Sequence, residues 1–243
     1  MEKETVLGYF NSDLVVDHYE LATERIGLWK SEEKIFQEIF NLEDSILELG
    51  CGVGRISFGL HELGYKHLLA SDYAKNMIQR ARALSKRMGY PVPFRVCDAT
   101  DLEFEDSVFE GAIFGFNGLM QIPKESNRIK AFKEIYRVLR KNGLFVFTSH
   151  LRSKAKHQKY WAEQEKLWAE GLQKESLDDF GDRFESTDMG DLYIHVPEQA
   201  TLESIVQDIG FKVEIVVPRS IIANENAIVR EFSDDCVFWI LRK

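Results

Sequence analysis

The chain of 243 residues contains few of the features that mark secreted or membrane proteins. Its three cysteines, Cys51, Cys97 and Cys236, form no C-x-x-C pair, which argues against disulfides and a zinc site. No apolar stretch approaches the roughly 18 residues that span a bilayer. The first residues, MEKE, lack the apolar core of a signal peptide. We therefore expect a cytoplasmic protein in a reducing compartment, without a membrane partner.

The chain also lacks an excess of positive charge. The chain has 31 Lys and Arg against 40 Asp and Glu, a formal net charge of −9. A nucleic-acid groove needs clustered basic side chains, so we expect no nucleic-acid partner. The six histidines are not spaced as metal ligands, and we expect no metal site. An apolar content of 44% in 243 residues is enough for one soluble domain with a full core.

One segment, residues 46–54 with the sequence ILELGCGVG, joins an apolar run to three alternate glycines. Because glycine has no Cβ, Gly50, Gly52 and Gly54 can turn the backbone sharply and let it approach a ligand closely. The carboxylate of Glu48 is unusual in an apolar strand, since a buried charge needs a donor or a cation. Glu48 either reaches water at the strand end or orders the loop and faces a positively charged ligand group.

Apolar runs alternate with amphipathic segments through the first part of the chain. Strands are expected over residues 46–49, 67–71, 93–97, 108–115 and 144–148. Strands separated by helical segments are typical of parallel βαβ units with right-handed crossovers. Two later strands, 212–217 and 237–242, have no helix predicted between them and are expected to pair as an antiparallel hairpin. The pattern predicts an α/β fold.

Four segments divide the single predicted domain. Residues 1–43 form an N-terminal helical cap, residues 44–150 and 199–243 form the core, and residues 151–198 form an insertion that interrupts the alternation. Within the insertion, apolar residues recur at helical spacing: Tyr160, Trp161, Leu167, Trp168 and Leu172. This stripe either packs on the core or belongs to a lid whose aromatic side chains wall a substrate pocket.

Two acidic residues end the second and third predicted strands, where ligands of open α/β sheets bind. Asp72 can accept both ribose hydroxyls of a nucleoside through charge-assisted hydrogen bonds, and Asp98 can accept from the adenine amine. Tyr73 and Met77 can cover the adenine ring. The segment that begins at Phe116 lies at the same edge, after the fourth strand. These positions predict a nucleoside site.

A dinucleotide site is the weaker interpretation. The G-x-G-x-x-G fingerprint needs its third glycine at position 55, which is Arg here. No tyrosine is followed by Lys four residues later, as short-chain dehydrogenases require. An NAD(P)-dependent oxidoreductase therefore remains only as an alternative.

The series Glu48-x-Gly50-x-Gly52-x-Gly54, followed by Asp72 and Asp98, resembles the class I S-adenosylmethionine-dependent methyltransferases. The resemblance implies a doubly wound, Rossmann-like sheet of seven strands in the order 3-2-1-4-5-7-6, with an antiparallel last strand. It also implies S-adenosylmethionine as the cofactor. By position, it assigns these contacts: Gly50, Cys51 and Gly52 to the methionine moiety, Asp72 to the ribose, Asp98 and Ala99 to the adenine, Arg55 to Glu48 or the ligand carboxylate, and Tyr19 or Arg25 to the methionyl end.

Methyl transfer needs mainly the in-line placement of a nucleophile, because a sulfonium methyl is already electrophilic. If a general base is used, His150 at the end of the fifth strand is the main candidate, and His195 and His18 are others. The site after the fourth strand lacks the Pro-Pro signature of enzymes that methylate planar nitrogens, which favours a small-molecule acceptor. A module that binds the cofactor without transferring its methyl group is the alternative. The acceptor atom and the oligomeric state stay open.

Overall fold

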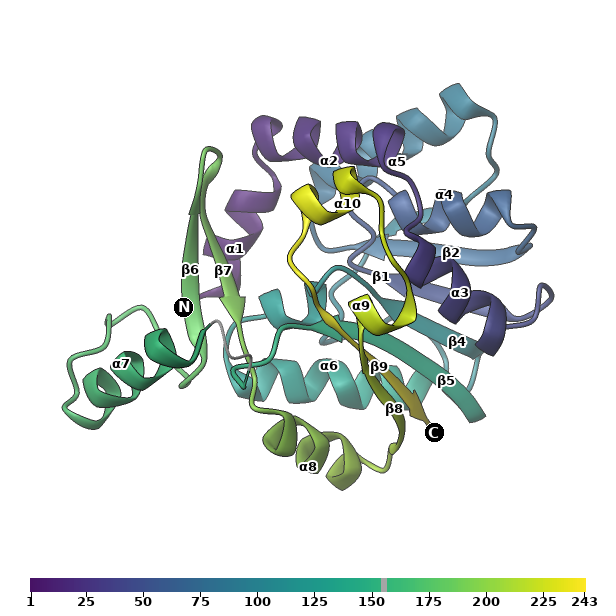
Figure 1. Ribbon diagram of the computed structural model, residues 1–243. Helices are drawn as coiled ribbons and strands as arrows, with labels where there is room; N and C mark the ends of the chain where they lie inside the picture. Colours follow the sequence, from purple (N-terminus) through teal and green to yellow (C-terminus); the bar gives the residue numbers. More distant parts are fainter. Residues whose placement is uncertain (154–156) are drawn as a thin grey trace.

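A computed structural model describes residues 1–153 and 157–243, and its centre is one seven-stranded sheet (Figure 1). The strand order is β3-β2-β1-β4-β5-β9-β8, which confirms the predicted topology. The first five strands in chain order are parallel, and β9 runs antiparallel to both β5 and β8. The seven strands are β1 (Ser45–Leu49), β2 (His67–Asp72), β3 (Phe94–Val96), β4 (Phe109–Phe114), β5 (Leu139–Ser149), β8 (Lys212–Pro218) and β9 (Val237–Arg242).

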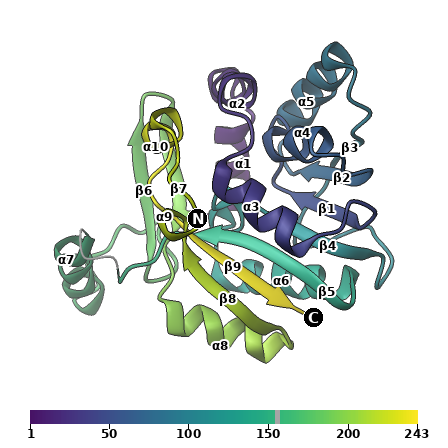
Figure 2. The same ribbon diagram turned by 45° about the vertical axis from the view of Figure 1, so that its right-hand side comes forward.

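Helices cover both faces of this sheet, as Figure 2 shows from the side. The helices are α1 (Lys3–Phe10), α2 (Asp13–Arg25), α3 (Lys30–Ile39), α4 (Arg55–Glu62), α5 (Lys75–Met88), the 3-10 turn η1 (Gly118–Gln121), α6 (Glu125–Val138), α7 (Gln158–Ala169), α8 (Gln199–Ile209), α9 (Arg219–Ile222) and α10 (Ala227–Phe232). Apolar residues of α3, α4 and α5 pack on one face, and those of α6 and α8 pack on the other. Because successive strand residues point to opposite faces, Ile46 joins the first core and Leu47 the second.

The insertion differs in part from both sequence interpretations. It contains α7 and a second sheet, the antiparallel hairpin of β6 (Asp182–Thr187) and β7 (Gly190–His195). Helix α7 stands away from the main sheet (Figures 1 and 2). Of its predicted stripe, Trp161 is buried, whereas Tyr160 and Leu167 are each 37% exposed. The prediction that the stripe packs on the core is therefore confirmed for Trp161, which belongs to the second core, but is wrong for Tyr160, Leu167 and Leu172. The aromatic rings of Trp161 and Trp168 also contact Phe180, within the insertion itself.

The connection between the last two strands also differs from the prediction. Strands β8 and β9 do pair in antiparallel fashion, but α9 and α10 lie between them in the sequence. These helices have four and six residues, too short for helical periodicity to identify them in the sequence. The segment that contains α9 and α10 is important because it brings Phe232, the last residue of α10, to the carboxyl edge of the parallel strands.

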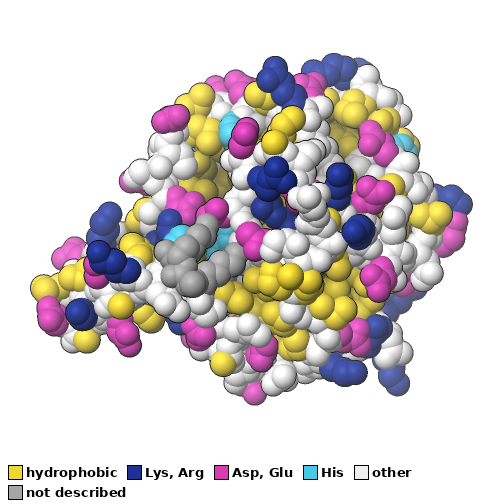
Figure 3. All heavy atoms as spheres, in the orientation of Figure 1, with side chains coloured by type: hydrophobic (Ala, Val, Ile, Leu, Met, Phe, Trp, Pro, Cys, Tyr) yellow, Lys and Arg dark blue, Asp and Glu magenta, His cyan; other side chains and the backbone are white. Residues whose placement is uncertain are grey.

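The outer end of the sheet is partly exposed. Strand β8 forms an edge, where Ile215 is 43% exposed, and Ile221 of the adjoining α9 is 75% exposed. Figure 3 shows apolar side chains gathered over this region, with acidic and basic side chains interspersed around them. Among residues 1–153 and 157–243, no helix has both the length and the apolar character needed to cross a membrane.

Candidate functional site

The main cavity lies at the carboxyl ends of β1, β2 and β4, where the strand order reverses. It encloses about 1160 Å³ of empty space, its open mouth included. Twelve of the fourteen predicted site residues line it: Tyr19, Glu48, Gly50, Cys51, Gly52, Arg55, Asp72, Tyr73, Met77, Asp98, Ala99 and Phe116. Residues from five predicted elements thus converge on one space, as the rule for open α/β sheets requires.

The glycine loop after β1 has the backbone geometry that its sequence suggested. Gly50, Gly52 and Gly54 have φ angles of +61°, +55° and +97°, a region that L side chains rarely adopt. A Cβ on Gly50 would lie 2.4 Å from the ring of Phe114, so this position also lacks space. A Cβ on Gly52 would meet only the ring of Tyr19, at 3.6 Å. The Tyr19 ring therefore lies close to the main chain at Gly52, and both residues border the cavity.

Asp72 ties the loop to the end of β2. Its carboxylate accepts hydrogen bonds from the backbone N–H of Gly52 at 2.8 Å and of Ala74 at 2.7 Å. Burial raises the pKa of Asp72, although these N–H groups oppose the shift by stabilising the anion. Each carboxylate oxygen can accept a second hydrogen bond, so Asp72 retains the capacity to bind a pair of ligand hydroxyls.

Glu48 is buried beneath the loop, with only 4% of its surface exposed. Its carboxyl group accepts a hydrogen bond from the Ser57 hydroxyl and borders the cavity. Burial raises the pKa of Glu48 to about 8, because the charged form is poorly solvated there. The interpretation of Glu48 as a strand-end charge in water is therefore wrong. A cation in the cavity would restore the charged form.

Arg55 has a different partner from the one we expected. Its Nη1 and Nη2 donate to the two carboxylate oxygens of Glu32, each at 2.6 Å, and Nη1 also donates to the carbonyl of Gly27. Although burial opposes ionisation, the Glu32 carboxylate raises the pKa of Arg55. The guanidinium also lies 4.6 Å from the ring centre of Trp29. The hydrogen bonds of Arg55 thus join α4 to α3, while its charge also lowers the pKa of Glu48, against the larger effect of burial.

Asp98 marks the opposite end of the cavity, at a segment tied to α1. Its carboxylate accepts hydrogen bonds from Lys3 Nζ at 2.8 Å and from the N–H and hydroxyl of Thr100 at 2.9 Å. Burial alone would raise the pKa of Asp98, but these donors hold it below its usual value. The sequence analysis did not identify Lys3. A ligand amine at Asp98 has to share the carboxylate with this ammonium group.

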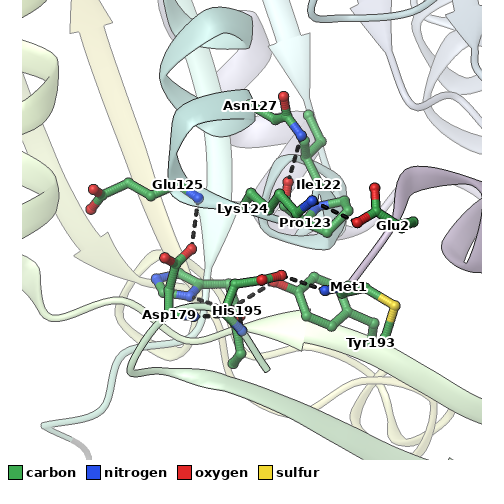
Figure 4. Close-up of polar contacts among 12 residues, drawn as sticks. Met1, Glu2, Ile122, Pro123, Lys124, Glu125, Asn127, Asp179, Tyr193 and His195 are labelled. Atoms are coloured by element: carbon green, nitrogen blue, oxygen red, sulfur yellow. Dashed lines mark hydrogen bonds and ion pairs between the residues drawn. The ribbon is translucent and has the colours of Figure 1, made fainter. Parts of the chain in front are cut away.

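Helix α1 forms a roof over the cavity. Val6, Leu7 and Phe10 line it together with Lys3, at the spacing of one helix face. Near the start of the helix, Glu2 pairs with Lys124 at 2.7 Å, as Figure 4 shows. The pattern of Lys3, Val6, Leu7 and Phe10 was visible in the sequence and could have identified this face. The described residues of the insertion do not line the cavity, so its predicted role as an aromatic wall is wrong.

Four candidate residues lie outside the cavity: Arg25, His150, His18 and His195. Arg25 is exposed at the end of α2, about 1.7 turns beyond Tyr19. His150 follows β5 and lies with its Nε2 3.2 Å from Asn117 Nδ2, and neither residue lines the cavity. His18, another candidate base, is exposed and stacks on Phe232. His150 thus lies at the predicted strand end, but neither it nor Arg25 or His18 lines the cavity.

His195 belongs to a separate group with Asp179 and Asp182, beside a second cavity of about 880 Å³ (Figure 4). The ligand atoms of these three side chains lie within 4.8 Å of one another, a spacing that could hold a metal ion. However, Asp182 already accepts hydrogen bonds from Tyr193, His195 and two backbone N–H groups. The guanidinium of Arg128 donates to Asp179 at 2.7 Å. Hydrogen-bond donors at Asp182 and the Arg128 guanidinium at Asp179 therefore already occupy the carboxylate oxygens that would bind a cation.

The His195 ring is an internal partner of Asp182. Burial alone would raise the pKa of Asp182, but hydrogen bonds from His195, the Asp179 N–H and Tyr193 hold it low. The ionised carboxylate can only accept, so His195 Nδ1 donates at 2.8 Å. Burial lowers the pKa of His195, which favours the neutral ring. His195 lines the second cavity, and not the one that contains the glycine loop.

Comparisons with known proteins agree with this geometry. The family described as "Methyltransferase domain" matches residues 46–143. A demethylmenaquinone methyltransferase of Leptospira interrogans is 35% identical over 105 residues, which are 42% of this chain and 41% of that protein. The ubiquinone/menaquinone biosynthesis C-methyltransferase UbiE of Rickettsia bellii is 29% identical over 157 residues, 60% of each chain. The chain therefore spans about two to three fifths of the length of these curated relatives.

A solved structure extends the likeness over most of the fold. The crystal structure of a SAM-dependent methyltransferase from Methanosarcina mazei superposes with a TM-score of 0.69 at 19% identity. It covers 89% of this chain and 98% of that one. At this identity the superposition shows the fold alone. Residues 46–143 are therefore similar to the methyltransferase domain family, and the strand order and fold of the chain are similar to those of a SAM-dependent methyltransferase.

Proposed function

We propose that this protein binds S-adenosylmethionine and transfers its methyl group to a small-molecule acceptor. The single observation that carries the proposal is the convergence of the glycine loop, Asp72 and Asp98 on one cavity. A sulfonium nucleoside needs a close approach to backbone at one end and acidic acceptors for its ribose and adenine. The residues present fit this group, because Gly50 and Gly52 border the cavity with backbone alone and Asp72 has acceptor capacity left.

Each lining residue has a distinct part in this proposal. Gly50, Cys51 and Gly52 lie against the methionyl portion, Asp72 binds the ribose hydroxyls, and Asp98 with Ala99 binds the adenine. Tyr73 and Met77 cover the adenine ring, and Tyr19 with Phe116 lies over the reacting end. Glu48 faces the ammonium group of the methionyl portion. When bound, the cofactor supplies an electrophilic methyl group, and the chain supplies orientation and exclusion of water.

Orientation can account for about 7–11 kcal/mol of a barrier of this kind, so a dedicated base is not essential to the proposal. The named relatives act in quinone biosynthesis, which supports a small molecule as the acceptor here. The acidic net charge supports the absence of a nucleic-acid partner. Three cysteines without a paired motif support a reducing location, the cytoplasm.

Calorimetry with S-adenosylhomocysteine and, separately, NADH tests the cofactor. We expect saturable binding of S-adenosylhomocysteine and none of NADH, and the reverse would refute the proposal in favour of an oxidoreductase. Transfer of radiolabel from methyl-labelled S-adenosylmethionine to a panel of phenols, quinols, thiols and amines tests the activity. Tight cofactor binding without transfer to any acceptor would instead indicate a module that binds the cofactor and does not use it.

A further inference from the structure

The wall of the main cavity divides into two chemically different parts. The part assigned to the cofactor contains every lining carboxylate, from Glu48, Asp72 and Asp98. The remaining part is formed by residues of α1, α2, α4 and α10, by the end of β4, and by residues in the segments 115–118 and 121–123. Apart from Thr23 and Gln121, the residues of this second part are apolar or aromatic: Val6, Leu7, Phe10, Tyr19, Ala22, Ile56, Phe114, Phe116, Ile122, Pro123 and Phe232, together with two glycines. We call this part the apolar wall.

Aromatic rings form the centre of the apolar wall. Phe232 is stacked with Phe116 at a centroid distance of 5.2 Å and an interplanar angle of 19°. His18 stacks on Phe232 in turn, at 5.5 Å and 16°. Tyr19 meets Phe116 edge to face at 6.1 Å. These rings come from three elements far apart in the sequence, and their contacts fix the orientation of Phe232 at the cavity.

The titratable groups of the apolar wall give a second constraint. Lys3 of α1 and Arg55 of α4 also line the cavity, but their charges are paired with Asp98 and Glu32. Among the other described residues of the apolar wall, the only ionisable group is the Tyr19 phenol. Burial raises the pKa of Tyr19, so that phenol stays protonated at neutral pH and cannot take a proton from an acceptor. An acceptor with a net charge would have no counter-ion on this side, and its desolvation would be uncompensated. The wall therefore suits an uncharged acceptor.

We propose that Phe232 determines acceptor specificity by selecting an uncharged, flat aromatic ring. This inference rests on the proposed function and assigns the substrate class of the same site. Aromatic rings attract one another in offset-stacked or edge-to-face arrangements, beyond the effect of buried area. Phe116 and His18 already stack on Phe232, so its edge is the part left for a ligand. A flat ring that presents its face to this edge gains an edge-to-face contact, whereas a saturated ring of similar size gains only burial.

The test compares two neutral probes on protein saturated with S-adenosylhomocysteine. The probes are 2-naphthol and its saturated counterpart, 2-decalol, and calorimetry measures the dissociation constant of each. We expect the wild type to bind 2-naphthol about tenfold more tightly than 2-decalol. F232L removes the ring and should reduce this preference to about twofold or less. F232Y retains the ring and should preserve the preference.

The matched control is F184L, because Phe184 is also a partly buried ring with an edge contact but does not line the cavity. F184L should leave the preference and the affinity for S-adenosylhomocysteine unchanged. Equal binding of both probes by the wild type, or an unaltered preference in F232L, would overturn the specificity role alone. Failure of the wild type to bind S-adenosylhomocysteine would overturn the proposed function and this inference with it.

Discussion

Replacing Glu48 by Gln should reverse the pH dependence of cofactor binding. In the ligand-free protein the pKa of Glu48 is raised to about 8 by burial. The proposed ligand has an α-ammonium group, whose ordinary pKa is about 7.8. The ion pair therefore needs Glu48 ionised and the ligand amine protonated. Lowering the pH favours the amine but neutralises Glu48, so the two groups oppose each other.

The magnitude follows from these two ionisations. Between pH 8 and pH 6 the ionised fraction of Glu48 falls from about one half to about one hundredth, while the protonated fraction of the amine rises about 2.5-fold. The product of the two fractions falls about twentyfold, equivalent to about 1.8 kcal/mol. In E48Q the residue at position 48 does not titrate, so only the protonation of the ligand amine changes with pH. The affinity of E48Q should instead rise about 2.5-fold over the same interval, from a weaker starting value at pH 8.

Calorimetry with S-adenosylhomocysteine at pH 6, 7 and 8 measures both profiles. Asp72, whose pKa is also raised by burial, is present in both proteins, so its contribution cancels in the comparison. Parallel pH profiles for the wild type and E48Q would refute the assignment of Glu48 to the ligand ammonium group.

Stability provides an independent check on the Glu48 pKa. Because this pKa is higher in the folded chain than in the unfolded chain, the folded state binds more protons between about pH 4.5 and pH 8. The contribution of Glu48 to the free energy of unfolding is thus fully present below about pH 4.5, and it is lost as the pH rises through about 8. E48Q should therefore gain stability relative to the wild type between pH 5 and pH 8, and thermal unfolding without ligand measures this.

Three further substitutions test the loop and its support. D72N should weaken S-adenosylhomocysteine binding by about 1.5–3 kcal/mol in calorimetry, since a charge-assisted acceptor is lost, whereas D101N at an exposed position should not. G50A should destabilise the protein in urea unfolding by more than G89A does, because both positions have positive φ but only Gly50 lacks space for a Cβ. E32Q should lower the free energy of unfolding by about 3–5 kcal/mol, because it leaves a buried guanidinium without its counter-ion.

Each of these predictions has an outcome that contradicts it. Unchanged affinity in D72N would remove the ribose assignment, and equal losses in G50A and G89A would show that φ alone limits the loop. For E32Q, the control is E214Q, which breaks the exposed pair with Arg242 and should cost less than about 1 kcal/mol. Equal effects of E32Q and E214Q would contradict the structural role of the buried pair.

Local patterns predicted the residues that follow strands, but not all of their partners. The glycine spacing and the strand ends placed Asp72 and Asp98 correctly at one cavity, because parallel strands end at the same edge. The partner of Arg55 was not predictable, since Glu32 lies 23 residues away on another helix. Similarly, no periodicity marks Phe232, which ends a helix of six residues.

The sequence by itself determined the parallel core, the loop of three glycines and the acidic ends of β2 and β3. These follow from period-two and helical patterns and from the conformational freedom of glycine, which act over a few residues. Only the tertiary structure decided that α1 roofs the cavity, that the described residues of the insertion do not line it, and that burial raises the pKa of Glu48. Those outcomes depend on packing between distant segments, and burial sets the electrostatic cost of a charge only once the chain has folded.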